Sequence, residues 1–192
     1  MSKKPSTFFN MVWTLFIISF FSSAALGFVY ELTKGPIAKA TLEKKIRAIQ
    51  EVVPAFDNNP LEEVYKVDVD AGTLFFYPAK KQDKLVGTAV ETFTTKGFSG
   101  TIKLMVGLLP DGTINKIVVV EAHETPGLGD KIKSEKSNFS KQFMSKNPSV
   151  FMLKVKKDGG SVDAITAATI SSRAFCDAVT RACQSYKKEL KK

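Results

Sequence analysis

The feature that most constrains this chain is an uncharged apolar run near its amino end. Phe8–Tyr30 contains 23 residues without a charge, and about 20 helical residues span the hydrocarbon core of a bilayer. Trp13 and Tyr30 lie near the two ends of the run, where amphipathic rings favour the membrane interface. The run predicts a transmembrane helix, with residues 1–30 as an anchor surrounded by membrane lipid.

A cleaved signal peptide is the alternative interpretation of the same run. Lys3 and Lys4 precede it, and Ser23, Ala24 and Ala25 are small residues of the kind that precede a cleavage site. Apolar side chains resume beyond them, which favours a retained anchor. Lysines flank both ends of the run, so the positive-inside rule does not decide which side of the membrane carries the remaining chain.

Residues 31–192 are expected to form one domain, since the whole chain has an ordinary globular composition of 44% hydrophobic and 24% charged residues. Gly35-Pro36 predicts a break and the start of a new helix that runs to about Val53. The Asp111-Gly112 pair indicates a hairpin turn. Strands are expected over 75–77, 85–93, 101–109, 114–122 and 150–155, a short helix over 138–146 and a last helix over 171–190. The predicted fold class is α+β, with an antiparallel sheet and helices at both ends.

Composition excludes several classes of protein. The chain has two cysteines and one histidine, which argues against a disulfide scaffold, a His-rich metal site and a Ser–His or Cys–His hydrolase. Cys176 and Cys183 are seven residues apart on the predicted last helix, roughly 10 Å by helical rise, and are expected to pack as small apolar groups. The net charge is +9, but no aromatic-interleaved basic motif predicts a nucleic-acid partner.

Two segments carry candidate site residues. The first, residues 121–130, follows an apolar strand and contains His123, Glu124, Pro126 and two glycines. Glycine lets backbone amides approach a ligand closely, although a plain turn would use the same residues. The lone His123 has no nucleophile beside it to activate.

The second segment, residues 163–173, crowds small and hydroxyl-bearing residues at the start of the last predicted helix. A helix amino terminus with free N–H groups is a ready phosphate site. The hydroxyls could instead cap the helix, and physical reasoning alone leaves the two interpretations open. The hydroxyl-bearing residues in question are Thr166, Thr169, Ser171 and Ser172.

At these segments the sequence resembles the FMN-binding domain family. Residues 163–169, Asp-Ala-Ile-Thr-Ala-Ala-Thr, are similar to its covalent-flavin signature, and residues 123–129, His-Glu-Thr-Pro-Gly-Leu-Gly, to its flavin-lining loop. The resemblance implies FMN bound covalently, as a phosphoester on Thr169 made from FAD by a flavin transferase. It also implies cofactor-binding roles for Glu124, Thr125, Gly127, Leu128, Thr166, Ala168 and Ser171. Ala167 departs from the pattern, because the family usually has glycine there.

Within the family, the whole-chain layout is similar to the flavin-carrying components of membrane-bound oxidoreductases. A length of 192 residues favours the Rnf-type ion-translocating complex, in which ferredoxin and NAD are handled by other subunits. The resemblance implies an electron-transfer subunit of a translocase, without an active site of its own. Its single-pass anchor would lie in the bacterial inner membrane, with residues 31–192 on the extracytoplasmic, periplasmic side.

Three alternatives remain from the sequence. One is a component like the flavin-carrying C-type component of the sodium-translocating NADH:quinone reductase, which tends to be longer. Another is a freestanding extracytoplasmic flavin reductase, for which titratable substrate-binding groups are not evident. The last is an anchor protein without flavin, which leaves the signature at Thr169 unexplained.

Overall fold

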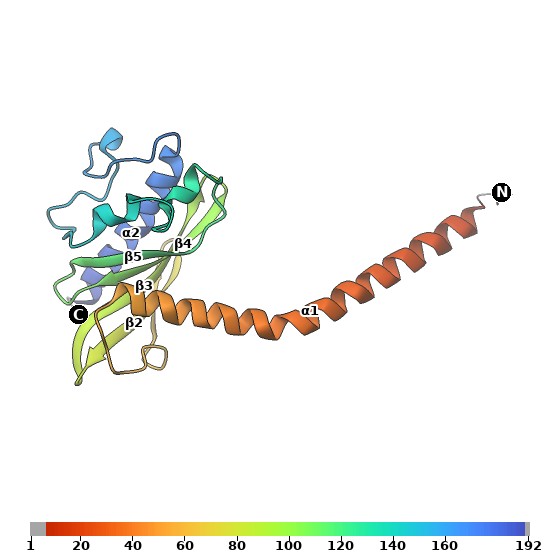
Figure 1. Ribbon diagram of the computed structural model, residues 1–192, viewed down its shortest axis with the longest axis horizontal. Helices are drawn as coiled ribbons and strands as arrows, with labels where there is room; N and C mark the ends of the chain where they lie inside the picture. Colours follow the sequence, from red (N-terminus) through yellow and green to blue (C-terminus); the bar gives the residue numbers. More distant parts are fainter. Residues whose placement is uncertain (1–6, 191–192) are drawn as a thin grey trace. The chain divides into compact units, whose positions relative to one another are not determined.

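The computed structural model describes residues 7–190, and these form two units, Met1–Lys44 and Lys45–Lys192, which are treated separately. The element order is α1 (Phe8–Val52), β1 (Tyr65–Val69), β2 (Gly72–Lys81), β3 (Lys84–Gly97), β4 (Gly100–Leu108), β5 (Ile114–Glu121) and α2 (Thr169–Glu189) (Figure 1). Three short 3-10 helices, Gly129–Ile132, Phe139–Phe143 and Lys156–Asp158, lie between β5 and α2.

The first unit is the exposed part of helix α1. By length and composition α1 can cross a membrane: its most apolar 18-residue window has a mean hydropathy of 2.0, and none of that window is buried within the protein. The apolar side chains of residues 8–30 are therefore left for lipid to cover. The predicted transmembrane helix agrees with this finding.

The expected break at Gly35-Pro36 is wrong, because α1 continues through Pro36 to Val52. Proline removes one backbone hydrogen bond and crowds the preceding turn, yet good helix-forming residues on both sides maintain the helix. The compact second unit begins at Lys45, so the boundary after residue 30 remains a prediction.

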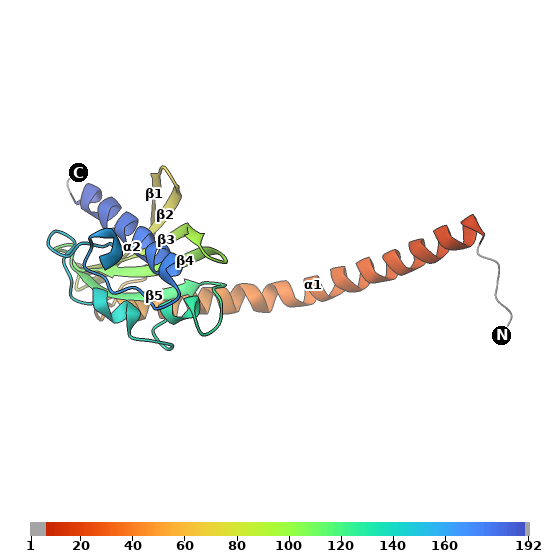
Figure 2. The same ribbon diagram turned by 90° about the horizontal axis from the view of Figure 1, so that it is seen from above.

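The second unit is built on a five-stranded antiparallel sheet in the order β1-β2-β3-β4-β5, a meander of consecutive hairpins. Residues that pair across it, such as Phe76, Val90, Val106 and Ile117, point to one face. Helix α2 packs on that face and closes the larger core, as Figure 2 shows. The predicted α+β class is confirmed.

The end of α1 covers the other face of the sheet. Ala48, Ile49 and Val52 are buried against a smaller cluster that includes Tyr77 and Met105. Part of this contact depends on a glycine of β4, Gly107, because a side chain there would overlap the Val52 carbonyl oxygen. Lys45 also pairs with Glu91 of β3 at 3.0 Å. The last two turns of α1 therefore belong to the folded domain.

Three further local predictions can be compared with the structure. The expected strand over 150–155 is wrong: Asn147 opens a turn there, Val150 is 89% exposed, and the segment makes one isolated parallel bridge, Val155 to Val162. Strand β1 was not predicted, although the alternation in Tyr65–Val69 is its signal. The expected short helix over 138–146 is present as the 3-10 turn Phe139–Phe143.

Truncation should distinguish the anchor from the domain. We expect a fragment of residues 31–192 to be soluble and folded, and a fragment of residues 45–192 to behave alike. A fragment of residues 55–192 should be destabilised by at least 3 kcal/mol, since it loses Ile49, Val52 and Val53 at about 1.5 kcal/mol each. Far-UV circular dichroism during thermal unfolding checks all three. Equal stability of the shortest and longest fragments would contradict the role given to the end of α1.

Candidate functional site

Three segments from distant parts of the sequence meet at the amino end of α2. They are the β3–β4 turn, the loop after β5 and the loop that leads into α2 itself. Together they enclose a cavity of about 320 Å³. Its lining residues are Phe98, Glu124, Thr125, Leu128, Gly129, Ala167, Ala168, Thr169, Ile170 and Ser171.

The carboxylate of Glu124 connects these three segments. Glu124 is buried, at 6% exposure, on the loop after β5. Its Oε2 accepts a hydrogen bond of 2.5 Å from the Ser171 hydroxyl in the first turn of α2. Its Oε1 accepts a hydrogen bond of 3.2 Å from the backbone N–H of Ser99 in the β3–β4 turn. A buried carboxylate is costly without partners, so these bonds hold both neighbouring segments in place.

Two glycines leave the space that this carboxylate occupies. A Cβ at Gly129 would lie 2.6 Å from both Glu124 Oε2 and Ser171 Oγ. A Cβ at Gly97 would lie 2.7 Å from Glu124 Oε1. Neither distance is compatible with a side chain, so both positions require glycine for close approach.

The amino end of α2 is not capped by a side chain. The N-cap residue is Ala168, which makes no capping hydrogen bond, and the first turn has no acidic residue. Ser172 instead donates to the Ala168 carbonyl oxygen and accepts from the N–H of Ile165, both at 3.0 Å. Ser171 is engaged with Glu124. The capping interpretation is therefore disfavoured, and the first amides of α2 are free for an anion.

Thr169 is the first residue of α2 and lines the cavity with a half-buried side chain. Thr166 is exposed and does not line the cavity. Between them Ala167 has a φ of 62°, in the left-handed region that favours glycine. The backbone at the one departure from the family pattern thus has the conformation for which glycine is suited.

The loop after β5 forms a turn in front of the cavity. The Thr125 carbonyl oxygen accepts from the N–H groups of Leu128 and Asp130, at 3.2 and 3.3 Å. Gly127 has a φ of 75°, which the turn requires, and points to open space rather than into the cavity. Leu128 extends from this turn and is 41% exposed.

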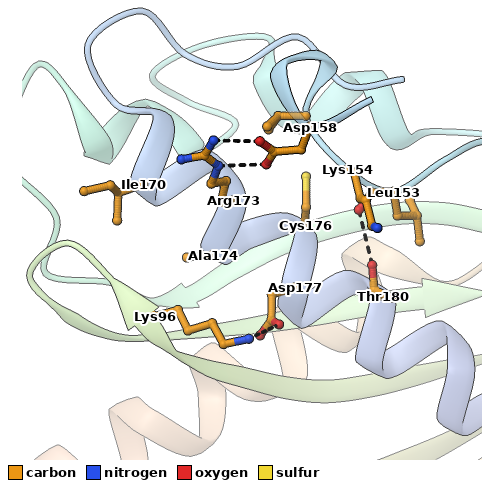
Figure 3. Close-up of a pocket in the computed structure, with 11 residues that line it drawn as sticks. Lys96, Leu153, Lys154, Asp158, Ile170, Arg173, Ala174, Cys176, Asp177 and Thr180 are labelled. Atoms are coloured by element: carbon orange, nitrogen blue, oxygen red, sulfur yellow. Dashed lines mark hydrogen bonds and ion pairs between the residues drawn. The ribbon is translucent and has the colours of Figure 1, made fainter. Parts of the chain in front are cut away.

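A second cavity, of about 480 Å³, runs along the flank of α2 and shares Ile170 with the first (Figure 3). Its charged groups are paired with each other: Arg173 donates to both carboxylate oxygens of Asp158, and Lys96 donates to Asp177 at 2.7 Å. No hydroxyl of the flavin-like signature lines this cavity. The second cavity therefore borders the candidate site without sharing its chemistry.

Six predicted site residues line the first cavity together: Glu124, Thr125, Leu128, Ala168, Thr169 and Ser171. Gly127 and Thr166 lie beside it. The prediction missed Phe98, Gly129 and Ile170 as lining residues. An aromatic side chain between two glycines, Gly97-Phe98-Ser99-Gly100, was the available signal for Phe98.

Other reactive side chains are unsuited to catalysis here. Cys176 and Cys183 are free and buried, and burial raises the pKa of each thiol to about 12, so both stay protonated at neutral pH. His123 is exposed and contacts Glu121 at 3.3 Å. Among residues 7–190, no cluster of His, Cys, Asp or Glu is arranged to hold a metal ion.

Residues 97–184, which contain the whole cavity lining, match the FMN-binding domain family. The fold and site thus define an FMN-binding protein with an apolar amino-terminal helix. Three relatives each bear the name of the G-type component of an ion-translocating oxidoreductase complex. The protein of Salmonella typhi is 38% identical over 88% of this chain and 86% of its own. That of Erwinia tasmaniensis is 39% identical (88% and 84%), and that of Escherichia coli K12 is 37% identical (88% and 86%). The chain belongs to this family of G-type components.

Substitution of Gly129 tests the close packing around Glu124. Gly129→Ala should lower the free energy of unfolding by about 2 kcal/mol, because overpacking of a buried site costs about 1–3 kcal/mol. Gly127→Ala is the matched control in the same loop: it meets no atom and costs about 1 kcal/mol through its positive φ. Urea unfolding followed by circular dichroism measures both. A Gly129→Ala protein as stable as the unsubstituted chain would contradict the packing described.

Proposed function

We propose that this chain carries FMN covalently, as a phosphoester on the hydroxyl of Thr169. The observation that carries the proposal is the position of Thr169: it is the first residue of an uncapped helix, half-buried, and lines the cavity within the FMN-binding match. A phosphate on its oxygen would lie at the positive end of the α2 dipole.

The residues around Thr169 fit such a group. The first amides of α2 can bind the phosphate, and the absence of a side chain at Gly129 keeps the cavity open beside them. The remaining walls are largely apolar, as suits a flavin ring. Both oxygens of Glu124 are bonded to the protein, so its main role is to fix the walls; a direct bond from Glu124 to the flavin remains a prediction.

The function that follows is electron transfer. Bound FMN supplies the redox chemistry, and the protein supplies position and surroundings. The chain brings no titratable side chain of its own to a second substrate: Glu124 is enclosed, and His123 lies exposed beside Glu121. We therefore assign it a redox subunit's role without an independent active site.

We infer that its partners are the other subunits of a membrane complex. The relatives are named as the G-type component of an ion-translocating oxidoreductase complex, and this name supports a role in coupling electron transfer between ferredoxin and NAD to ion movement across the membrane. The same name favours this complex over the sodium-translocating NADH:quinone reductase. A freestanding flavin reductase would need a substrate site that the described residues do not offer.

The proposed location is the bacterial inner membrane, with one pass through α1 and the flavin domain on the periplasmic side. The length and apolarity of α1 support the single pass, and the family resemblance supports the side. A flavin transferase would attach FMN from FAD: the Thr169 oxygen replaces AMP on the FMN phosphorus, and the hydroxyl proton is released. A covalent bond suits this location because the cofactor cannot be lost.

Thr169→Ala tests the attachment. It removes the acceptor oxygen but leaves a small helix-forming residue, so the fold should survive with a change of less than about 1 kcal/mol. When the chain is coexpressed with a flavin transferase, we expect the mass of an FMN adduct and denaturation-resistant fluorescence to disappear. Thr169→Ser, which keeps a hydroxyl, should retain both signals.

Thr166→Ala is the neighbouring control, since its exposed side chain lies outside the cavity lining. It should keep at least part of the adduct. An FMN-sized adduct on the Thr169→Ala protein would sink the assignment of Thr169, and a chain without any adduct would sink covalent attachment altogether.

A further inference from the structure

Three large apolar side chains surround Thr169 and stay in solvent. Phe98 of the β3–β4 turn is 66% exposed, Ile170 of α2 is 49% exposed, and Leu128 of the loop after β5 is 41% exposed. All three line the same cavity, although they come from three separate segments. Grouped exposed apolar side chains at a cavity mark a surface that something covers.

Phe98 is held at this position by the backbone around it. The turn joins β3 to β4 through Gly97-Phe98-Ser99-Gly100, and Gly100 has a φ of 112°. The N–H of Ser99 donates to Glu124, whose other oxygen is bonded to α2. A Cβ at Gly97 would displace this carboxylate. The exposed phenyl ring therefore stands on a turn that is tied to the helix carrying Thr169.

We propose that Phe98 covers one face of the flavin ring, with Leu128 and Ile170 as the apolar edges of the same enclosure; this rests on the proposed attachment at Thr169. Phe98 is the only aromatic residue of the lining. A flat phenyl ring packs well against a flat tricyclic ring and removes apolar surface of both from water. Thr169 lines the same cavity, so the attached flavin is the occupant within reach, ahead of a partner protein.

Phe98→Ala tests this inference in the full-length chain, purified in detergent after coexpression with a flavin transferase. The FMN adduct should remain, because the acceptor hydroxyl is unchanged. Iodide quenching of flavin fluorescence should rise about twofold or more, and the visible circular dichroism of the flavin should fall by half or more. Phe98→Tyr should restore both signals, since it keeps the ring. Ser99→Ala, in the same turn, should leave them unchanged because it retains the backbone N–H that Glu124 accepts.

The outcomes separate the two proposals. Attached flavin with quenching and dichroism equal to those of the Ser99→Ala protein would overturn the role of Phe98 and leave the attachment intact. Loss of the adduct from the Phe98→Ala protein would also overturn it, because Phe98 would then serve attachment rather than cover the ring. An unsubstituted chain without an adduct would overturn the proposed function and the enclosure with it.

Discussion

The buried carboxylate of Glu124 is the interaction on which the candidate site depends. It joins the β3–β4 turn through Ser99 and the first turn of α2 through Ser171, and it belongs to a third segment. A carboxylate with one partner removed would be left poorly compensated in a buried place. Each segment is therefore positioned by the other two, and glycine at positions 97 and 129 provides the space this requires.

Much of this arrangement could be predicted from the sequence, and particular residues show where prediction ended. The hydroxyl of Thr169 and the loop containing Glu124 were recognisable from short motifs, and both line one cavity. The Ser171 bond to Glu124 was not predictable, because it joins residues 47 positions apart through tertiary packing. Local propensity also misjudged Pro36, which lies inside a continuous helix.

The loop before α2 shows a second limit of pattern reasoning. Ala167 differs from the family's usual glycine by one methyl group, and the sequence alone gave that difference little weight. Its φ of 62° shows why glycine is common there: the chain must turn left-handed immediately before the acceptor residue. Alanine tolerates this conformation at a cost of about 1 kcal/mol, so the turn persists with less freedom in its backbone.

The two cysteines of α2 have a consequence for export. Cys176 and Cys183 face the core, and burial keeps their thiols protonated. Disulfide exchange proceeds through the thiolate and requires access to the sulfur. Once folded, the domain is thus chemically indifferent to an oxidising compartment, and only the unfolded chain exposes sulfur to thiol oxidants. Rapid folding after translocation would then protect the domain from cross-linking without any dedicated reductant.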